Sequence, residues 1–154
     1  PQIFAAEISK VEKLLVPSEN TDFPLKLIGR RHLRSNNSWM HNLPMLKGGT
    51  RKCTVMIHPD DAKQALIQDK ELVEVYSSNG RIHIEAEVTE DIIGGTICIP
   101  HGWGHGGKGT SQKVADSMGG ANVNELMDHK RLDPLSYNMA FSGQPVAIRK
   151  IEMD

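Results

Sequence analysis

The sequence predicts a mainly β domain, a small closed barrel with one or two short helices and long polar loops. Six or seven short apolar segments are separated by turn residues, whereas residues 30–50 and 101–121 are long, polar and irregular. The length of 154 residues and the hydrophobic fraction of 38% are those of one globular domain with a real core. A closed barrel is favoured because it leaves no exposed sheet edge.

Residues 1–22 are expected to be a linker with a short helix, followed by the barrel domain over residues 23–154. Apolar residues recur at helical intervals over residues 3–15, and Pro17 ends this pattern. The chain starts with Pro1 rather than Met, and no signal-peptide pattern opens it. We therefore expect a domain that is part of a longer protein.

Two strands and a helix start are predicted in the first half of the barrel. Residues 23–29 (FPLKLIG) and 53–57 (CTVMI) are apolar and partly β-branched, as strands commonly are. The segment His58-Pro59-Asp60-Asp61 then predicts the start of a helix. Proline suits the first helical position, and aspartates favour the positive end of the helix dipole.

A hairpin is predicted over residues 71–88. Its second strand alternates apolar and polar side chains from Ile82 to Val88, which is typical of a strand with one buried face. The Asn79-Gly80 pair predicts a type I′ turn, in which both central residues have positive φ. The remaining elements predicted are a turn at Gly94-Gly95, a buried strand at 96–100, a helical turn within 121–127 and a last strand at 145–151.

Charge is unevenly distributed along a chain whose formal net charge is only −1. No acidic residue lies between Asp22 and Asp60, a stretch that contains Lys26, Arg30, Arg31, Arg34, Lys47, Arg51 and Lys52. A block of one sign favours an anionic partner, and a solvated basic loop is the alternative. The aromatic fraction of 5% argues against base stacking on nucleic acid. No apolar run is long enough to span a membrane.

The first polar loop, GRRHLRSNNSWMHN (29–42), combines three arginines, two histidines and a run of Asn and Ser. Arginine matches phosphate oxygens with two parallel hydrogen bonds, and Asn and Ser offer neutral donors and acceptors. This mixture suits a phosphorylated ligand with a heterocycle. A flexible basic loop is the alternative.

The second polar loop starts with PHGWGH (100–105) and is rich in glycine, whose backbone can approach an anion closely. A metal site at His101 and His105 is disfavoured, because the glycines oppose a helix and no third ligand is near. Trp39 and Trp103 lie in the two loops, either as core residues or as the wall of a ligand site.

Asn122 and Asn124 offer amides that can read a purine edge; capping or turn formation is the alternative. No catalytic residue and no metal ligand is predicted in this chain. Cys53 and Cys98 lie in apolar strands, where a thiol is commonly an inert core residue. That placement argues against a disulfide scaffold and fits a reducing compartment, so we expect a cytoplasmic protein.

Four ordered pieces of the chain resemble a known family: LIGRRHLRSNNSWMHNLP, the stretch CTVMIHPDD to ICIPHGWGH, GGANVNELMD and LDPLSYN. They are similar to the molybdopterin-dinucleotide-binding domain at the C-terminus of the molybdopterin oxidoreductases, which include dimethyl sulfoxide reductases, formate dehydrogenases and periplasmic-type nitrate reductases. The resemblance covers about residues 23–151. It implies a six-stranded double-psi β-barrel that closes over bis(molybdopterin guanine dinucleotide).

The loops and the resemblance together predict the residues that bind the cofactor. They are Gly29, Arg30, Arg31, His32, Arg34, Ser35, Asn36, Asn37, Ser38, Trp39, His101, Gly102, Trp103, Asn122 and Asn124. The chain departs from the family at His58, where an asparagine is usual, and at Ile28, where a threonine often precedes the Gly-Arg pair. The first change affects a helix cap, and the second removes one possible hydroxyl contact.

The resemblance implies that the molybdenum or tungsten ligand, and any iron–sulfur cluster, belong to other domains of a parent enzyme. The expected partners are those domains and a small-molecule redox substrate at the parent active site, with no nucleic acid and no membrane contact. The isolated domain should be inactive.

Three alternatives remain open from the sequence. One is a stand-alone small barrel subunit, as in formylmethanofuran dehydrogenases. Another is a self-sufficient enzyme resembling aspartate decarboxylase, which would need a self-cleaving Gly-Ser pair that this sequence lacks. The third is a basic nucleic-acid binder, which salt-dependent binding to DNA would reveal.

Overall fold

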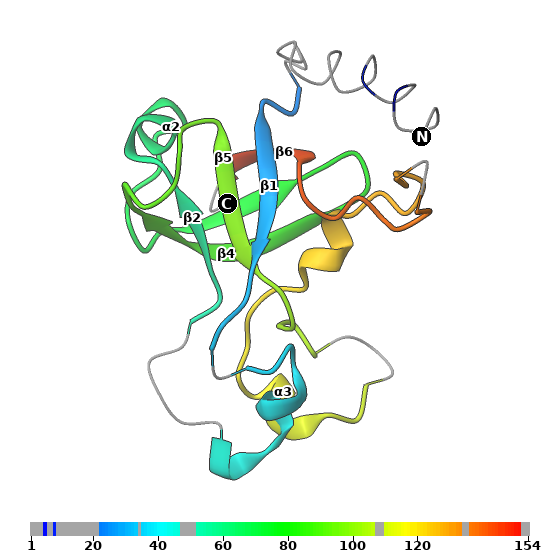
Figure 1. Ribbon diagram of the computed structural model, residues 1–154. Helices are drawn as coiled ribbons and strands as arrows, with labels where there is room; N and C mark the ends of the chain where they lie inside the picture. The colour runs from blue at the N-terminus through cyan, green and yellow to red at the C-terminus, as the bar shows by residue number, and fades with distance from the viewer. Residues whose placement is uncertain are drawn as a thin grey trace.

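Six strands form a closed barrel in a computed structural model that describes Ala5, Ile8 and residues 22–33, 35–46, 52–106, 110–133 and 136–151 (Figure 1). The strands are β1 (Leu25–Arg30), β2 (Thr54–Ile57), β3 (Leu72–Tyr76), β4 (Arg81–Val88), β5 (Thr96–Pro100) and β6 (Gln144–Lys150). The predicted mainly β class is confirmed. No helix among the described residues is long and apolar enough to cross a membrane.

The strand order around the barrel is β1-β5-β2-β4-β3-β6. Neighbours β1 and β5 run parallel, as do β2 and β4, and the other four pairs are antiparallel. Strand β5 therefore lies between β1 and β2, while β2 lies between β5 and β4. This interlocked arrangement is the double-psi barrel that the resemblance implies.

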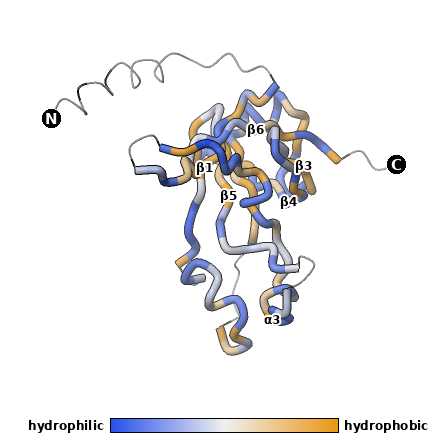
Figure 2. Tube along the Cα trace, turned by 90° about the vertical axis from the view of Figure 1, so that its right-hand side faces the viewer, coloured by the Kyte–Doolittle hydropathy of each residue, from blue (hydrophilic) through white to orange (hydrophobic). Residues whose placement is uncertain are grey.

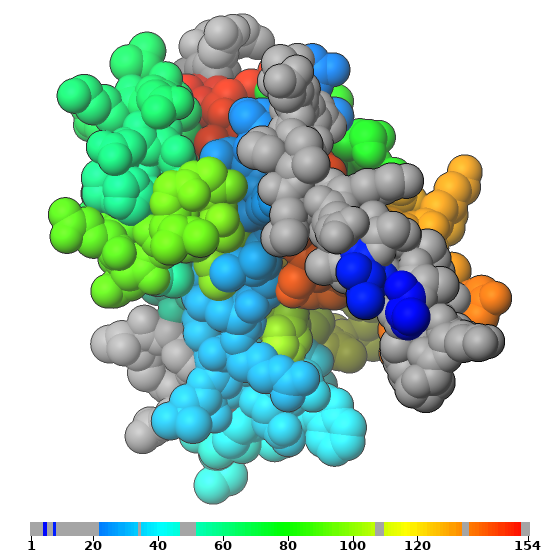
Figure 3. Space-filling model, turned by 45° about the horizontal axis from the view of Figure 1, so that its top comes forward, coloured from blue at the N-terminus to red at the C-terminus, as the bar shows by residue number. Residues whose placement is uncertain are grey.

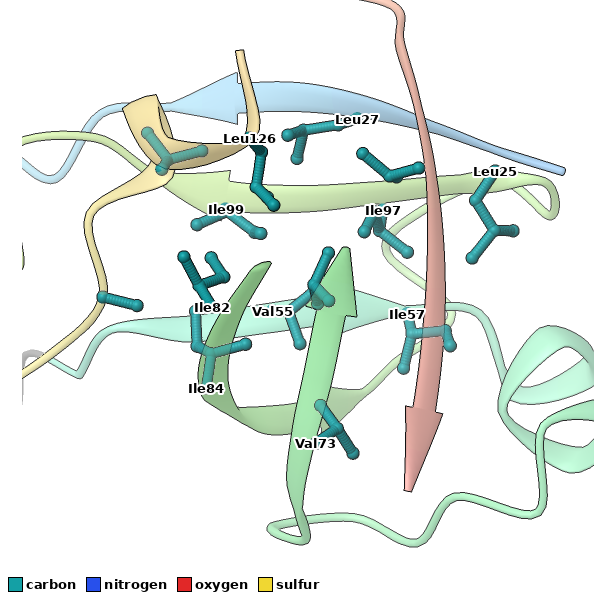
Figure 4. Packing of buried hydrophobic residues seen from close by; sticks show 14 of the residues in the cluster. Leu25, Leu27, Val55, Ile57, Val73, Ile82, Ile84, Ile97, Ile99 and Leu126 are labelled. Atoms are coloured by element: carbon teal, nitrogen blue, oxygen red, sulfur yellow. The ribbon is translucent and has the colours of Figure 1, made fainter. Parts of the chain in front are cut away.

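Side chains from all six strands fill the barrel (Figure 4). Leu27, Val55, Val73, Ile97 and Val146 have no exposed surface, because alternate positions of each strand point inward. Burying one such side chain stabilises the fold by about 1.5–3 kcal/mol. One end of the barrel is filled by Leu126, which Figure 4 shows beside Leu27 and Ile99.

Five short helices lie outside the barrel wall among the described residues: α2 (Pro59–Gln64), α3 (Lys113–Asp116) and the 3-10 helices η1 (Trp39–Asn42), η2 (Pro44–Leu46) and η3 (Val123–Leu126). Helix α2 begins as predicted, with Pro59 in its first turn and the His58 side chain accepting a hydrogen bond from Asp60 N. The helix predicted over residues 3–15 lies outside the described residues, apart from helical Ala5 and Ile8.

The two long polar loops are more regular than expected. The first contains η1 and η2, the second contains α3, and together they form a loop lobe (residues 31–33, 35–46 and 110–120) below the barrel (Figures 1 and 2). Asn42 joins the two segments, since its Oδ1 accepts a hydrogen bond of 3.3 Å from Ala115 N. A contact between segments so distant in sequence leaves no local pattern from which either helix could be predicted.

The hairpin of β3 and β4 is confirmed, but the predicted type I′ turn is wrong. Neither Asn79 nor Gly80 has positive φ. The Ser77 hydroxyl accepts hydrogen bonds from Asn79 N (3.0 Å) and Gly80 N (3.3 Å), which provides an alternative way to close the loop. Position 80 still requires glycine, because a Cβ there would overlap the carbonyl oxygen of Glu125.

Candidate functional site

The main candidate site is a cleft of about 520 Å³ at the carboxyl ends of β1 and β5. Because β1 and β5 are parallel neighbours, the two polar loops leave the barrel at the same edge. The cleft is lined by Gly29, Arg30, Arg31, Asn37, Ser38, His101, Gly102, Asn124, Phe141 and Ser142. All of these except Phe141 and Ser142 were predicted. Its volume is that of a typical small-molecule site.

His101 connects the two loops within the cleft. Its Nδ1 lies 3.0 Å from the carbonyl oxygen of Arg30, and its Nε2 lies 3.0 Å from Asn37 Oδ1. The backbone N–H of His101 also donates to the Arg30 carbonyl oxygen, at 3.2 Å. The imidazole ring is therefore held between the end of β1 and the turn at residues 36–37, where both asparagines have positive φ.

Two glycines give the cleft its shape. Gly102 has φ of +81°, and a Cβ at this position would overlap the carbonyl oxygen of Asn37. At Gly29, a Cβ would overlap the ring of Phe141. Backbone, amide and aromatic groups can therefore pack closely here, which larger residues would prevent.

The side chain of Arg30 points away from the cleft, along the outer face of the barrel. It donates to the carbonyl oxygen of Cys98 (2.5 Å) and to Thr54 O (2.9 Å) and Oγ1 (2.8 Å). Glu87 Oε2 lies 3.5 Å from the same guanidinium. Arg31, in contrast, is exposed and makes no ion pair with any residue that the structure describes, so its charge is available to a ligand.

Several predicted site residues have structural roles outside the cleft. Ser35 is buried, and its hydroxyl donates to the His32 carbonyl oxygen at 2.9 Å. Asn122 caps η3, because its Oδ1 accepts from Asn124 N at 3.2 Å. Trp103 is only 4% exposed, and its ring centroid lies 4.5 Å from that of His41. Trp103 therefore packs inside the loop lobe and does not form a wall of the cleft.

The remaining predicted residues that the structure describes do not line the cleft. His32 lines a second cleft of about 380 Å³ on the outer face of β2 and β4. Asn36 is exposed in the turn beside Asn37, and Trp39 is 76% exposed on η1. Arg34 lies outside the described residues.

Phe141 and Ser142 were missed by the sequence reasoning. They precede β6, which pairs with β1, and Gly143 N donates to the Leu27 carbonyl oxygen at 2.8 Å. This pairing places Phe141 against Gly29 and brings Ser142 to the cleft. Figure 3 shows the segment after β1 and the segment before β6 on the same face. No local pattern marks such a contact between distant segments.

Both histidines of the second loop have a protein partner at Nε2. His105 Nε2 lies 2.8 Å from the Gly102 carbonyl oxygen, while His101 Nε2 faces Asn37. Among the described residues there is no group of three or more His, Cys, Asp or Glu side chains that could hold a metal ion. Cys53 and Cys98 are both free thiols.

A closed barrel with a polar cleft between two glycine-containing loops is typical of a ligand-binding module. The family model described as "Molydopterin dinucleotide binding domain" matches residues 25–145. The chain therefore belongs to this family of cofactor-binding domains, as the resemblance implied.

Similar proteins of known description are much longer than this chain. The chain is 29% identical over 96 residues to "Putative dimethyl sulfoxide reductase chain YnfE" of Escherichia coli (strain K12), covering 62% of this chain and 12% of that protein. It is 39% identical over 71 residues to "Trimethylamine-N-oxide reductase" of Haemophilus influenzae, covering 45% and 9%. The chain thus spans about a tenth of these relatives.

A solved structure with the same fold is "Acetylene Hydratase from Pelobacter acetylenicus". The TM-score is 0.68, with 23% sequence identity, over 94% of this chain and 20% of that chain. At this identity the similarity shows the fold alone.

Proposed function

We propose that this chain is the domain of a molybdenum- or tungsten-containing oxidoreductase that holds molybdopterin guanine dinucleotide. The observation that supports this most directly is the cleft at the carboxyl ends of β1 and β5, which combines a cation, amides, a hydroxyl and glycine-lined backbone. These are the groups that bind pyrophosphate and heterocycle edges. The barrel domain spans residues 23–154, after a linker at residues 1–22.

The residues of the cleft divide the binding among them. Arg31 offers its guanidinium to a phosphate oxygen, since no described carboxylate neutralises it. Ser38 offers a hydroxyl that makes no capping hydrogen bond to η1. Asn124 is exposed at the other wall of the cleft and can donate and accept at a heterocycle edge. The ring of Phe141 adds an apolar surface next to Gly29.

The chemistry itself comes from the cofactor, which supplies a metal centre able to exchange two electrons with a substrate. The chain contributes binding and orientation, and the parent enzyme contributes the metal ligand and any iron–sulfur cluster. Relatives named as reductases match this chain in sequence, and a structural neighbour named as a hydratase shares its fold. This supports a module that holds the cofactor and leaves the reaction to other domains. The free thiols support a cytoplasmic location.

Titration of the 154-residue chain with guanosine diphosphate tests the proposal. We expect saturable binding that Arg31→Ala weakens by about tenfold, the loss of one charge-assisted hydrogen bond. The difference should shrink as salt is added, because added salt screens exposed charges.

Lys26→Ala is the matched control, since Lys26 is an exposed cation of the same strand region that does not line the cleft. Equal weakening by both variants would indicate general charge attraction rather than a site. Absence of saturable binding to the unaltered chain would contradict the proposal.

A further inference from the structure

The side chain of Arg30 connects four strands that are consecutive around the barrel. From the end of β1 it crosses β5, where it bonds the Cys98 carbonyl oxygen, and β2, where it bonds both oxygens of Thr54. It ends beside Glu87 on β4. We call Arg30, Thr54, Glu87 and the Cys98 carbonyl the Arg30 network.

The positive charge of Arg30 is compensated inside this network. The Thr54 hydroxyl accepts from the guanidinium and donates to Glu87 Oε2 at 2.5 Å, so both partners fix its direction. The Arg30 side chain is 19% exposed and the Glu87 side chain 46%. A guanidinium bound to a carboxylate, a hydroxyl and two carbonyl oxygens has few donors left for another anion.

The backbone of Arg30, in contrast, belongs to the cleft. Its carbonyl oxygen accepts from His101 N and lies 3.0 Å from His101 Nδ1, while His101 Nε2 contacts Asn37. The position of the Arg30 peptide thus determines where the His101 ring and the Asn37 amide lie. The side-chain network on the outer face holds that peptide in place.

We propose that Arg30 is a positioning residue, which acts through the Arg30 network to hold His101 and Asn37 in the cleft and does not itself contact the ligand. This inference rests on the proposed function for the identity of the ligand. It differs from the sequence-based prediction, which counts Arg30 among the cofactor-binding residues, and among the described arginines it leaves Arg31 to contact a phosphate.

A substitution at Glu87 distinguishes a positioning role of Arg30 from direct contact with the ligand. The two roles predict opposite changes in binding affinity. If Arg30 only attracted an anion, Glu87→Gln would remove a competing negative charge and strengthen binding. If Arg30 positions the cleft, Glu87→Gln weakens binding although Glu87 does not line the cleft. Arg30→Lys keeps the charge, but one ammonium group cannot reach the Cys98 carbonyl, Thr54 and Glu87 together.

The experiment compares guanosine diphosphate binding by the 154-residue chain and three variants, Arg30→Lys, Glu87→Gln and Thr54→Val, at low salt. We expect each variant to weaken binding by roughly threefold to tenfold, as for other losses of a charge-assisted hydrogen bond. The matched control is Glu85→Gln, two residues earlier on β4, where the carboxylate pairs with exposed Lys52 at 3.3 Å. This control should leave the affinity unchanged.

The nitrogen chemical shifts of the His101 ring provide a readout without ligand. They should move in Arg30→Lys and Glu87→Gln, and stay in place in Glu85→Gln, while circular dichroism shows that each variant is folded. Stronger binding by Glu87→Gln, or unchanged His101 shifts in both variants, would overturn the positioning role. If the unaltered chain showed no saturable binding while the His101 shifts moved in the variants, the proposed function would fail and the positioning role would stand.

Discussion

At Gly102 the two cleft loops lie in close contact. Its φ of +81° is unfavourable for other residues, and a Cβ would also overlap the Asn37 carbonyl oxygen. We expect Gly102→Ala to lower the free energy of unfolding by about 2–4 kcal/mol, since a strained backbone and a steric overlap add. Denaturant unfolding followed by circular dichroism measures the change.

Gly95 is the matched control for Gly102. It has a similar φ of +75°, but nothing lies within 4 Å of its expected Cβ. Gly95→Ala should therefore cost only the backbone preference, about 1 kcal/mol. Equal losses at the two positions would show that the overlap with Asn37 is relieved by movement of the turn.

For single residues, the sequence predicted which residue types lie at the site but not the directions of their side chains. The Gly-Arg pair, Asn37, His101 and Gly102 were all predicted at the site, and all line the cleft. The direction of the Arg30 side chain depends on Thr54 and Glu87, which only barrel closure brings near. Which cations remain unpaired is likewise a property of the folded chain.

One hydroxyl group makes three hydrogen bonds at the turn of the β3–β4 hairpin. Ser77 Oγ accepts from Asn79 N and Gly80 N and donates to the Leu126 carbonyl oxygen at 2.9 Å. We expect Ser77→Ala to destabilise the chain by about 1–3 kcal/mol, because the Leu126 carbonyl and two turn amides lose their partner. Ser78→Ala, at the exposed neighbour, should change the unfolding free energy by less than about 0.5 kcal/mol.

A cluster of charged side chains joins β3, β4 and β6 on their outer face. Glu74 pairs in register with His83 on β4 and Arg149 on β6. Its carboxylate lies 2.8 Å from Arg149 Nε and 3.3 Å from His83 Nε2. Burial raises the pKa of Glu74, but these hydrogen bonds and the nearby arginine charges outweigh burial and hold it below its ordinary value.

Because the pKa of Glu74 is lowered in the folded state, the stability of the barrel depends on pH in the acidic range. Because the folded pKa lies below the unfolded value of about 4.3, the stabilisation is present above that value and is lost as the pH falls through the folded pKa. Urea unfolding between pH 7 and pH 3 should show this loss, and Glu74→Gln should flatten it. Glu90→Gln, on the exposed loop after β4, should leave the acid dependence in place.

Prediction from sequence worked better for the strands than for the geometry of the Asn79-Gly80 turn. Alternation of apolar and polar residues identifies β4, and apolar segments identify β2, β3 and β5. These patterns are local in the sequence, because they follow from which face of a strand is buried. The turn at Asn79-Gly80 follows a different geometry, because Gly80 must also fit against η3. Helices η1, η2 and α3 form where distant segments pack together.

At the scale of the whole molecule, part of the charge of the acid-free stretch is paired with the acidic remainder of the chain. Arg30 lies beside Glu87 and Lys52 beside Glu85, so two cations of the stretch are paired across strands. The formal net charge of −1 conceals this pairing. Among the described cations of the stretch, Arg31 lines the cleft and makes no ion pair with a described residue, so the proposed binding of an anion would rely on it more than on the summed charge of the stretch.

The reactivity of the two thiols can be used to follow unfolding of the barrel. Cys98 lies on β5 and is 7% exposed. Burial raises the pKa of the Cys53 thiol, and this effect outweighs the backbone hydrogen bond from Ala121 and the charge of Arg30, which both lower that pKa. At neutral pH we expect slow labelling of both by a thiol reagent. In a Cys53→Ala variant, the labelling rate of Cys98 should follow global unfolding in denaturant. Immediate labelling of folded Cys98 would show local opening of β5.

Strand β6 pairs with β1 on one side and β3 on the other, and it follows the other five strands in the chain. During synthesis on the ribosome, β1 and β3 must therefore wait with unpaired edges until Gln144–Lys150 emerges, a state in which strands readily join wrong partners. Phe141 and Ser142 emerge only shortly before β6. The lining of the cleft is therefore complete only once nearly all of the barrel has been translated.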